Sequence, residues 1–358
     1  MQKFKTVWIL LRSHVVTLPP IMTVIKYLLE SDIYNVNFIS TQSVNLTHPN
    51  LKEFIIDQDH HLNKLSKVKD YIKYRKMVGR VLTENLKGED IIWLASLDTA
   101  LACMGLSFFK TNSYILHLHE LYDTHQTRLK LVKKIAQNAK YVVVPEDNRA
   151  GILQVWLELK NKPIVLPNKP YSHPRNKKLK ATHPLTIEIL ERYKTDKHII
   201  IYQGHIGGDR NLLPIAMAVR DLPDCEFWLL GKDHNEHSKK LEAISENIRY
   251  LGNVPAPYHL EITSYADIGV MSYDLVTLNN LYCAPNKVWE YMGFNMFFIC
   301  NQVKSLGYYE KLGVCKIVDF KDVYNIKKII KKEISCKKDF NNIYEGCDCK
   351  HIINEIMN

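Results

Sequence analysis

The sequence predicts an α/β protein built from two Rossmann-like, doubly wound domains that face one cleft. Short runs rich in β-branched residues alternate with longer segments of helical period, and this rhythm stops at one proline-rich and lysine-rich stretch before it starts again. A length of 358 residues is sufficient for two domains. Such alternation implies parallel strands joined by crossover helices, with the functional loops at the carboxyl ends of the strands.

The first half of the chain carries five predicted strands and an early helix. Pro20 opens that helix, because proline is favoured at a first helical position, and an apolar stripe follows it. The strands are expected at 6–11, 36–39, 90–95, 114–117 and 141–144. The loops expected to carry function in this half are Arg12-Ser13-His14, Ser96, His117 to Glu120 and Pro145 to Asn148.

The second half repeats the rhythm without repeating the residues. Its strands are expected at 198–202, 226–230, 248–251, 268–271, 296–300 and 316–319, followed by a helix over 323–332. We therefore divide the chain into an N-terminal domain (1–170), a linker (171–185), a C-terminal domain (186–338) and a C-terminal helix (339–358). A return of this helix to the N-terminal domain is one option.

Composition indicates an ordinary globular protein, with 46% hydrophobic and 24% charged residues. Arg12 interrupts the first apolar run too early for a signal peptide, and no apolar stretch reaches the roughly eighteen residues of a membrane span, so a cytoplasmic location is expected. The eight cysteines follow no disulfide spacing. Cys336, Cys347, Cys349 and His351 either bind a metal or are incidental residues of the final helix.

The net charge of +10 points to anionic partners. A basic amphipathic helix is expected over 62–86, which either contacts the inner face of the cell membrane or is an ordinary solvated surface helix. We expect no nucleic acid, because finger spacing, a recognition helix and interleaved basic and aromatic residues are all missing from the sequence. The basic residues of this helix are Lys64, Lys67, Lys69, Lys73, Arg75, Lys76 and Arg80.

The most informative stretch runs from 279 to 293. Polar residues lead into Pro285, and the alternation that follows predicts a helix whose first turn leaves backbone N–H groups free to bind an anion. Lys287 and Glu290 lie three residues apart on one helix face. A cation, amide donors and a carboxylate suit the diphosphate and hydroxyls of a nucleotide sugar. The alternative is a solvated ion pair on a surface helix.

A glycine-rich turn follows the first strand of the second half. Gly204, Gly207 and Gly208 permit a tight turn and a close backbone approach to phosphate. We expect Asp209 to cap the next helix, which places Arg210 in its first turn as a phosphate ligand. An ordinary strand-to-helix turn is the alternative. Two later loops, with Gly231 and with Asn253-Val254, are expected to contact a nucleotide base through backbone atoms.

These motifs together resemble the GT-B glycosyltransferases of family 4, the group 1 transferases, of the bacterial polysaccharide-biosynthesis type. The resemblance covers nearly the whole chain. Its most specific segment is Pro285 to Met292. The other matching segments are Gly204 to Arg210, Leu230-Gly231, Leu251 to Val254, Ala266 to Val270, Leu118 to Tyr122, Val144 to Ala150 and Leu166 to Pro170.

The resemblance implies transfer of a hexose from a nucleotide diphosphate sugar to a saccharide or lipid-linked saccharide, with retention, in surface polysaccharide synthesis. It further implies that Arg210 and Lys287 neutralise the leaving diphosphate, that Glu290 holds ribose hydroxyls, and that His119 and Glu120 face the transferred sugar. No metal or other cofactor is implied. The donor-binding set by position is Gly204, Gly207, Gly208, Arg210, Gly231, Asn253, Val254, Asn279, Asn280, Tyr282, Asn286, Lys287 and Glu290.

The chain departs from the family pattern at two places. Tyr282 stands where many members have a second glutamate that holds the sugar, and Asn279 or Asn280 is the candidate substitute. The loop after the first strand has Arg12-Ser13-His14 in place of the usual glycines, and we assign it to the acceptor side.

Three other interpretations remain open. Asp57-Gln58-Asp59-His60-His61 has the DxD form that binds a divalent cation in other glycosyltransferases, although it is also an ordinary polar loop. A sugar-nucleotide epimerase would keep the phosphate ligands and release a free sugar. A non-catalytic basic adaptor at a membrane surface would leave Arg210, Lys287 and Glu290 apart from one another.

Overall fold

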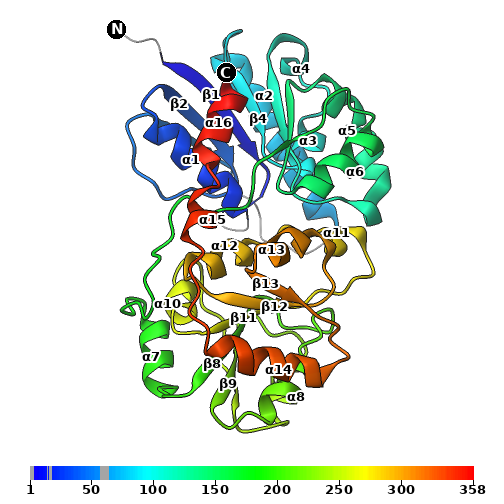
Figure 1. Cartoon of the computed structure of the whole chain (residues 1–358). Helices are drawn as coiled ribbons and strands as arrows, with labels where there is room; N and C mark the ends of the chain where they lie inside the picture. The colour runs from blue at the N-terminus through cyan, green and yellow to red at the C-terminus, as the bar shows by residue number, and fades with distance from the viewer. Residues whose placement is uncertain (1–3, 14, 16–17, 57–63) are drawn as a thin grey trace. The chain divides into compact units, whose positions relative to one another are not determined.

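A computed structural model describes residues 4–13, 15, 18–56 and 64–358, which form two compact α/β units, each with its own parallel sheet (Figure 1). Unit 1 comprises Met1–Tyr171 and Asp348–Asn358, and unit 2 comprises Ser172–Cys347. Helices flank both sheets, so the predicted fold class of two Rossmann-like domains is confirmed.

The sheet of unit 1 has seven strands in the order β3-β2-β1-β4-β5-β6-β7, and every pairing is parallel. All five predicted strands are present. The strands are β1 (Lys5–Leu11), β2 (Tyr34–Ser40), β3 (Leu51–Ile55), β4 (Ile91–Leu94), β5 (Tyr114–His117), β6 (Tyr141–Val144) and β7 (Ile164–Val165). The helices are α1 (Pro19–Glu30), α2 (Lys64–Asn85), α3 (Leu97–Cys103), α4 (Phe108–Thr111), η2 (Asp123–His125), α5 (Gln126–Asn138), α6 (Asp147–Leu157) and α16 (Cys349–Met357).

The two strands that the sequence analysis missed, β3 and β7, lie at the edges of this sheet. Edge strands bury less side-chain surface, so their sequences need fewer apolar residues. β3 carries Lys52 and Glu53 in its middle, and β7 is two residues long. Neither strand therefore has the continuous apolar run by which a buried parallel strand is found.

Unit 2 contains a six-stranded parallel sheet in the order β10-β9-β8-β11-β12-β13. Its strands are β8 (His198–Gln203), β9 (Cys225–Leu230), β10 (Ile248–Tyr250), β11 (Ile268–Met271), β12 (Phe297–Cys300) and β13 (Cys315–Ile317). Its helices are α7 (Pro184–Arg192), α8 (Leu213–Arg220), α9 (His237–Glu242), α10 (His259–Thr263), α11 (Leu278–Leu281), α12 (Asn286–Gly293), η3 (Lys304–Leu306), α13 (Gly307–Lys311), α14 (Val323–Ile334) and α15 (Asn341–Glu345).

Alternate residues of each central strand feed separate cores on the two faces of this sheet. In β8, Ile199 and Ile201 pack with α12, whereas Ile200 and Tyr202 pack with α8 and α14. Side chains of successive strand residues point to opposite faces, and both faces are covered, which explains the continuous apolar run from 199 to 202. α12 is thus held against the sheet by Val288, Trp289, Tyr291 and Met292.

Two segments differ from their predicted form. The stretch 171–185, expected as a linker, is packed on unit 2 from Ser172 onward: the Lys178 N–H donates to the Ser264 carbonyl at 3.1 Å. The tail expected as a single helix over 339–358 forms α15 and α16. The break between them lies at Asp348, whose side chain caps α16 by accepting from the His351 N–H at 2.9 Å.

The C-terminal helix α16 belongs to unit 1 and contacts α1 (Figure 1). Lys350 on α16 pairs with Glu30 of α1 at 3.4 Å, and the Cys349 thiol lies 3.8 Å from the Pro167 carbonyl oxygen. Ile353, Ile356 and Met357 are buried. The last residues of the chain therefore complete the core of the first unit.

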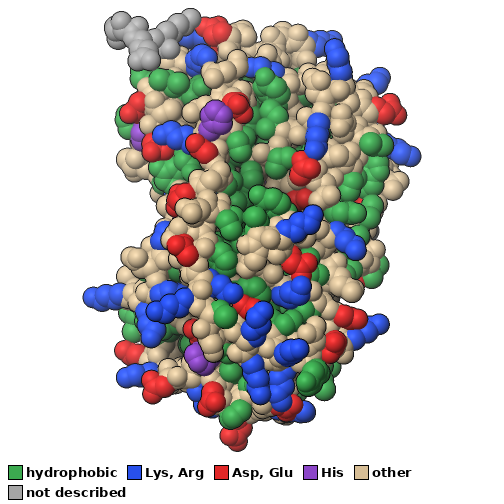
Figure 2. All heavy atoms as spheres, viewed as in Figure 1, with side chains coloured by type: hydrophobic (Ala, Val, Ile, Leu, Met, Phe, Trp, Pro, Cys, Tyr) green, Lys and Arg blue, Asp and Glu red, His purple; other side chains and the backbone are tan. Residues whose placement is uncertain are grey.

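Basic side chains are spread over several elements. The helix predicted over 62–86 corresponds to α2, and residues 62 and 63 lie outside the described residues. In unit 2, Lys and Arg side chains gather over the part of the surface where α14 lies (Figure 2), and α14 carries Lys327, Lys328, Lys331 and Lys332. None of the helices described is both long enough and apolar enough to cross a membrane.

Candidate functional site

Two glycine turns at the carboxyl edge of the unit 2 sheet bring the ends of β8 and β9 into close contact. Gly204 has φ +130° and Gly231 has φ +140°, a region that other residues rarely adopt. A Cβ on Gly231 would lie 1.9 Å from the Gly204 carbonyl oxygen, and a Cβ on Gly204 would lie 2.8 Å from Lys287 Nζ. Glycine at 204 therefore makes room for the Lys287 ammonium group, and glycine at 231 lets the two turns approach each other.

Lys287 lies in the first turn of α12, with its ammonium group between two tyrosine rings. Its Nζ is 4.6 Å from the ring centroid of Tyr202 and 5.7 Å from that of Tyr273. Aromatic faces attract a cation without neutralising it. Burial, with the nearby Arg210 charge, lowers the pKa of Lys287 to about 8. The site thus holds a cation that is available to an anion.

Arg210 joins this group from the loop before α8. Its guanidinium carbon lies 4.7 Å from the Tyr273 ring centroid, and its Nη1 donates to the Asp209 carboxylate at 2.6 Å. The expected cap was wrong: α8 begins at Leu213, and Asp209 binds Arg210 instead of a helix N-terminus. Residues 207–210 form a turn, with the Arg210 N–H donating to Gly207 at 2.9 Å, so the helix starts later than predicted.

Glu290 is half-buried, one turn along α12 from Lys287, with its side chain 16% exposed. The Gln203 amide donates to its carboxylate, and His259 Nε2 lies 3.4 Å from its Oε1. Burial alone would raise the pKa of Glu290, but the hydrogen bond from His259 and the charges of His259 and Lys287 outweigh it, and the pKa is lowered. Glu290 is therefore a carboxylate.

The solvated ion pair between Lys287 and Glu290 does not form: these two described side chains make no salt bridge with each other and have different partners. That alternative is wrong. The adaptor interpretation predicts that Arg210, Lys287 and Glu290 lie apart from one another. That prediction is wrong, because the three residues converge on one edge of the sheet.

Four residues that build this site were not singled out from the sequence, namely Tyr202, Gln203, Tyr273 and His259. Tyr202 and Gln203 end β8, and Tyr273 follows β11 by two residues. Polar residues at the carboxyl end of a buried parallel strand were the available signal. His259 opens α10, and nothing in its local sequence connects it to Glu290.

The remaining predicted donor ligands lie in loops and short helices of unit 2. The Gly252 carbonyl accepts from the Gly231 N–H at 2.8 Å, which joins the β10 loop to the β9 loop. Asn253 is exposed, and the Val254 side chain is buried in the core. Asn279 and Asn280 lie on α11, Tyr282 follows it, and Asn286 opens α12, while Gly207 and Gly208 lie in the turn after β8. Their roles stay predictions.

In unit 1, the loop after β1 is tied to the first turn of α3 by an ion pair. Arg12 donates through Nε to the Asp98 carboxylate at 2.5 Å, and Arg128 donates to its other oxygen at 3.0 Å. The Arg12 N–H donates to Thr99 Oγ1 at 2.9 Å, and the Ser13 carbonyl accepts from Ser40. His14 lies outside the described residues.

His119 and Glu120 follow β5 and are joined through Arg149. His119 is buried, with its Nε2 2.9 Å from the Ala95 carbonyl and its ring 4.1 Å from that of His117. Burial lowers the pKa of His119 to about 4. The Arg149 guanidinium donates to the His119 carbonyl and lies 3.3 Å from Glu120. His119 is therefore a neutral imidazole at neutral pH.

Of the two metal interpretations, only the one at the C-terminal cysteines and His351 falls on described residues. Asp57 to His61 lies outside the described residues. Cys336 is exposed, Cys349 is buried against Pro167, and His351 pairs with Glu355 at 3.2 Å. Within the described ranges, no three His, Cys, Asp or Glu side chains are placed to hold an ion together.

No protein-family model matches this sequence, and no curated protein matches it. Solved structures do match. Anabaena HepE in complex with UDP and glucose has a TM-score of 0.68 at 13% identity, with 98% of both chains covered. Sucrose-phosphate synthase from Thermosynechococcus elongatus has a TM-score of 0.66 at 13% identity, covering 99% of this chain and 95% of that one.

A glycosyltransferase from Rickettsia africae is similar to the same extent, with a TM-score of 0.68, 13% identity and coverage of 99% of this chain and 94% of that one. At such low identity the likeness concerns the fold. The chain therefore has the two-domain α/β fold of the GT-B type that the sequence predicts.

Proposed function

We propose that the chain is a glycosyltransferase that moves a hexose from a nucleotide diphosphate sugar to a saccharide or lipid-linked saccharide, with retention, in surface polysaccharide synthesis. One observation carries this proposal: the cations of Lys287 and Arg210 share the ring of Tyr273 beside the Gly204 turn. The aromatic ring supports two like charges close together; Arg210 is also paired with Asp209, whereas Lys287 has no carboxylate partner in the described chain. A diphosphate is the dianionic group that such a pair fits.

The chemistry follows from where charge develops. When the bond from the sugar to the diphosphate breaks, negative charge grows on the departing oxygen, and cations already in position stabilise that transition state. Lys287 and Arg210 take this role, and the Glu290 carboxylate accepts from ribose hydroxyls. Gln203 and His259 fix the Glu290 carboxylate in place, so they act as positioning residues.

The nucleotide is proposed to be UDP. HepE, solved with UDP and glucose, supports this choice. In unit 1, His119 is proposed to contact the transferred sugar. Its Nε2–H donates to Ala95, and its Nδ1, which is buried and has no protein partner among the described residues, is the acceptor that we propose for a sugar hydroxyl. Glu120 and Arg12-Ser13-His14 are assigned to the acceptor side.

A peripheral membrane contact through α2 is also part of the proposal. Val68 and Ile72 are 58% and 46% exposed, and Lys69, Lys73 and Lys76 are exposed on the same helix. Apolar and basic side chains together favour an anionic lipid surface. Flotation with vesicles of phosphatidylglycerol is expected to capture the chain, and a Lys69→Glu/Lys73→Glu variant should no longer float. Equal capture by phosphatidylcholine vesicles would contradict an electrostatic contact.

The test of the function begins with thermal shift against UDP, GDP and ADP and their glucose or mannose derivatives. A ligand that binds only the folded chain raises the melting temperature, so UDP should stabilise the protein. The stabilising nucleotide sugar is then incubated with saccharide acceptors. Transfer to an acceptor supports the proposal, free sugar with no acceptor product points to the epimerase, and no stabilisation by any nucleotide contradicts both.

A further inference from the structure

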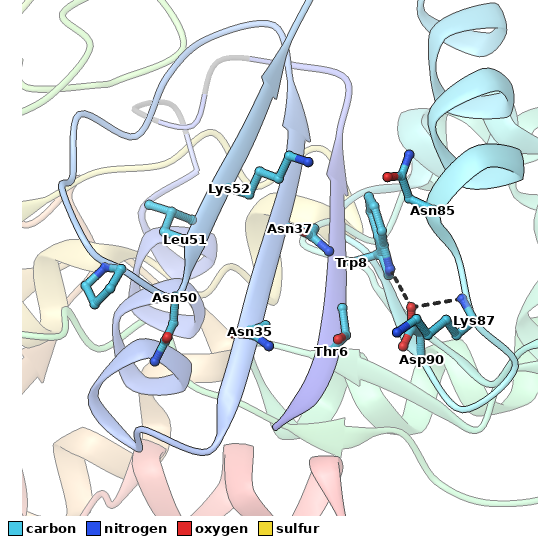
Figure 3. A pocket seen from close by; sticks show the side chains of 11 residues that line it. Thr6, Trp8, Asn35, Asn37, Asn50, Leu51, Lys52, Asn85, Lys87 and Asp90 are labelled. Atoms are coloured by element: carbon cyan, nitrogen blue, oxygen red, sulfur yellow. Dashed lines mark hydrogen bonds between the residues drawn. The ribbon is translucent and has the colours of Figure 1, made fainter. Parts of the chain in front are cut away.

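A polar hollow of about 320 Å³ opens on one face of the unit 1 sheet, away from the carboxyl edge (Figure 3). It crosses β3, β2 and β1 and reaches the turn before β4. Trp8, in its wall, precedes Arg12 by four residues along β1, which is about 13 Å at the rise of a strand. The hollow is lined by Thr6, Trp8, Asn35, Asn37, Pro49, Asn50, Leu51, Lys52, Asn85, Lys87 and Asp90.

The sequence of β2 places polar side chains on this face of the sheet. Buried parallel strands are usually continuous apolar runs, yet β2 alternates as Tyr34-Asn35-Val36-Asn37-Phe38. The register pairs Thr6 with Asn35 and Trp8 with Asn37, so these four side chains share one face. Asparagine is disfavoured in strands, so two of them in β2 cost stability. A ligand that binds to these asparagines would explain their presence in the strand.

The hollow contains hydrogen-bonding groups that the protein does not use. Asp90 is 3% exposed, and its Oδ2 accepts from Trp8 Nε1 at 2.9 Å and from the Lys87 N–H at 3.0 Å. Its Oδ1 has no partner among the described residues, and neither do the half-buried carboxamides of Asn35 and Asn37. Figure 3 shows these side chains around the same space. None of these free atoms is fully buried, so each is open to the hollow, where the hydroxyls of a polar ligand can take the place of water.

We propose that this hollow binds a neutral saccharide. Sugar hydroxyls both donate and accept, as carboxamides do, and Asp90 Oδ1 accepts from a further hydroxyl. Leu51, which is half-buried in the wall, supplies apolar surface for the C–H groups of a sugar ring. An anionic ligand is disfavoured, because the buried charge at this site is the Asp90 carboxylate, while Lys52 and Lys87 are exposed.

This saccharide site goes beyond the proposed transfer reaction and does not depend on it. A volume of about 320 Å³ is at the small end of the range for ligand pockets, which suits one or two sugar rings. The hollow lies away from the carboxyl edge of the unit 1 sheet, and His119 is not among the residues that line it. Such a site would retain a longer saccharide on unit 1 while its other end is free.

The test is saturation-transfer difference NMR on the full chain with glucose, N-acetylglucosamine and maltose as probes. At least one of these sugars should receive saturation, and Asn35→Ala/Asn37→Ala should weaken its binding by about tenfold or more. The matched control is Asn138→Ala, an exposed asparagine on α5 in the same unit, which should bind as the wild type does. Absence of saturation for all three sugars would overturn the proposal.

Two further measurements separate this site from the donor site. Saturating UDP should leave the sugar signal unchanged, whereas its displacement by UDP would assign the sugar to unit 2 and overturn the proposal. Circular dichroism of the double variant checks that it is folded. Should it unfold, Thr6→Val, which removes one hydroxyl from the same wall, takes its place with an expected reduction of about threefold, and unchanged affinity would count against the hollow.

Discussion

The carboxyl edges of the two sheets both carry arginines and histidines, but they differ in how the positive charge is compensated. In unit 1, Arg12 and Arg128 share the carboxylate of Asp98, and Arg149 is paired with Glu120. Each of these three arginines therefore faces a carboxylate of the protein, although Arg12 and Arg128 share one.

The edge of unit 2 includes a cation that has no carboxylate partner in the described chain. Arg210 is paired with Asp209, but Lys287 forms no ion pair with a carboxylate of the described chain and is supported by Tyr202 and Tyr273. The difference teaches that the number of basic residues does not identify an anion site. A cation held on aromatic rings remains available to a diphosphate, whereas a cation held by a carboxylate is already satisfied.

The largest effect that would test this difference is expected at Lys287. Replacement by alanine removes a cation aimed at the departing diphosphate, so turnover should fall by about 10²- to 10³-fold, with a smaller loss of donor affinity. Steady-state kinetics with the stabilising nucleotide sugar measures both quantities. Lys311→Ala, an exposed lysine of the same unit, is the control. Normal turnover of the Lys287 variant would contradict the assignment of the donor site to α12.

The second effect concerns Glu290. Glu290→Gln keeps the shape of the side chain but loses a charge-assisted acceptor, so donor binding should weaken by about 1 to 3 kcal/mol. Isothermal titration with UDP-sugar measures this loss, and Glu188→Gln on the exposed face of α7 serves as the control. A loss of melting temperature with unchanged donor affinity would instead make Glu290 a structural partner of Gln203 and His259.

The third effect is a pH dependence that the edge of unit 1 should not share. The pKa of Lys287 is about 8 in the free protein, below its ordinary value, so half of the ammonium form remains at pH 8 and the rest is lost as pH rises above it. UDP affinity should therefore fall above pH 8, by up to about tenfold per pH unit. Lys287→Arg, whose guanidinium stays charged, should flatten the profile.

The same shift has an opposite consequence for stability. Burial disfavours the Lys287 ammonium in the folded chain, so its contribution destabilises the fold at pH values below 8 and this cost is relieved as pH rises above 8 towards the unfolded value. Wild type without UDP should therefore lose less stability between pH 8 and 10 than Lys287→Arg does. Parallel unfolding curves at all pH values would contradict the assigned pKa.

The smallest effect tests unit 1. Asp98→Asn removes the carboxylate shared by Arg12 and Arg128, so this edge should gain affinity for inorganic phosphate and lose about 1 kcal/mol of stability. Titration calorimetry with phosphate, in the absence of nucleotide, measures the gain. Asp147→Asn, whose carboxylate pairs with Lys162 on the exposed surface, is the control. Equal phosphate binding by wild type and Asp98→Asn would contradict the proposed difference between the units, namely that Asp98 keeps the unit 1 arginines from binding an anion.

The sequence alone was sufficient to predict the fold class, eleven of the strands and the helix that carries Lys287 and Glu290. Local period and turn chemistry report directly whether a segment is a buried strand or an amphipathic helix. The same reasoning missed β3 and β7, because edge strands need no continuous apolar run. It also placed Arg210 in a helix that begins three residues later.

Tertiary structure decided what surrounds each charge. Gln203 reaches Glu290 across 87 positions of sequence, and Tyr273 supports both Arg210 and Lys287 from a third loop. The periodicity of the sequence does not reveal such contacts, because they arise only when parallel strands bring their carboxyl ends to one edge of a sheet. The sequence determined which residues lie at the strand ends. Their packing determined that Lys287 stands on aromatic rings while Arg12 is held by Asp98.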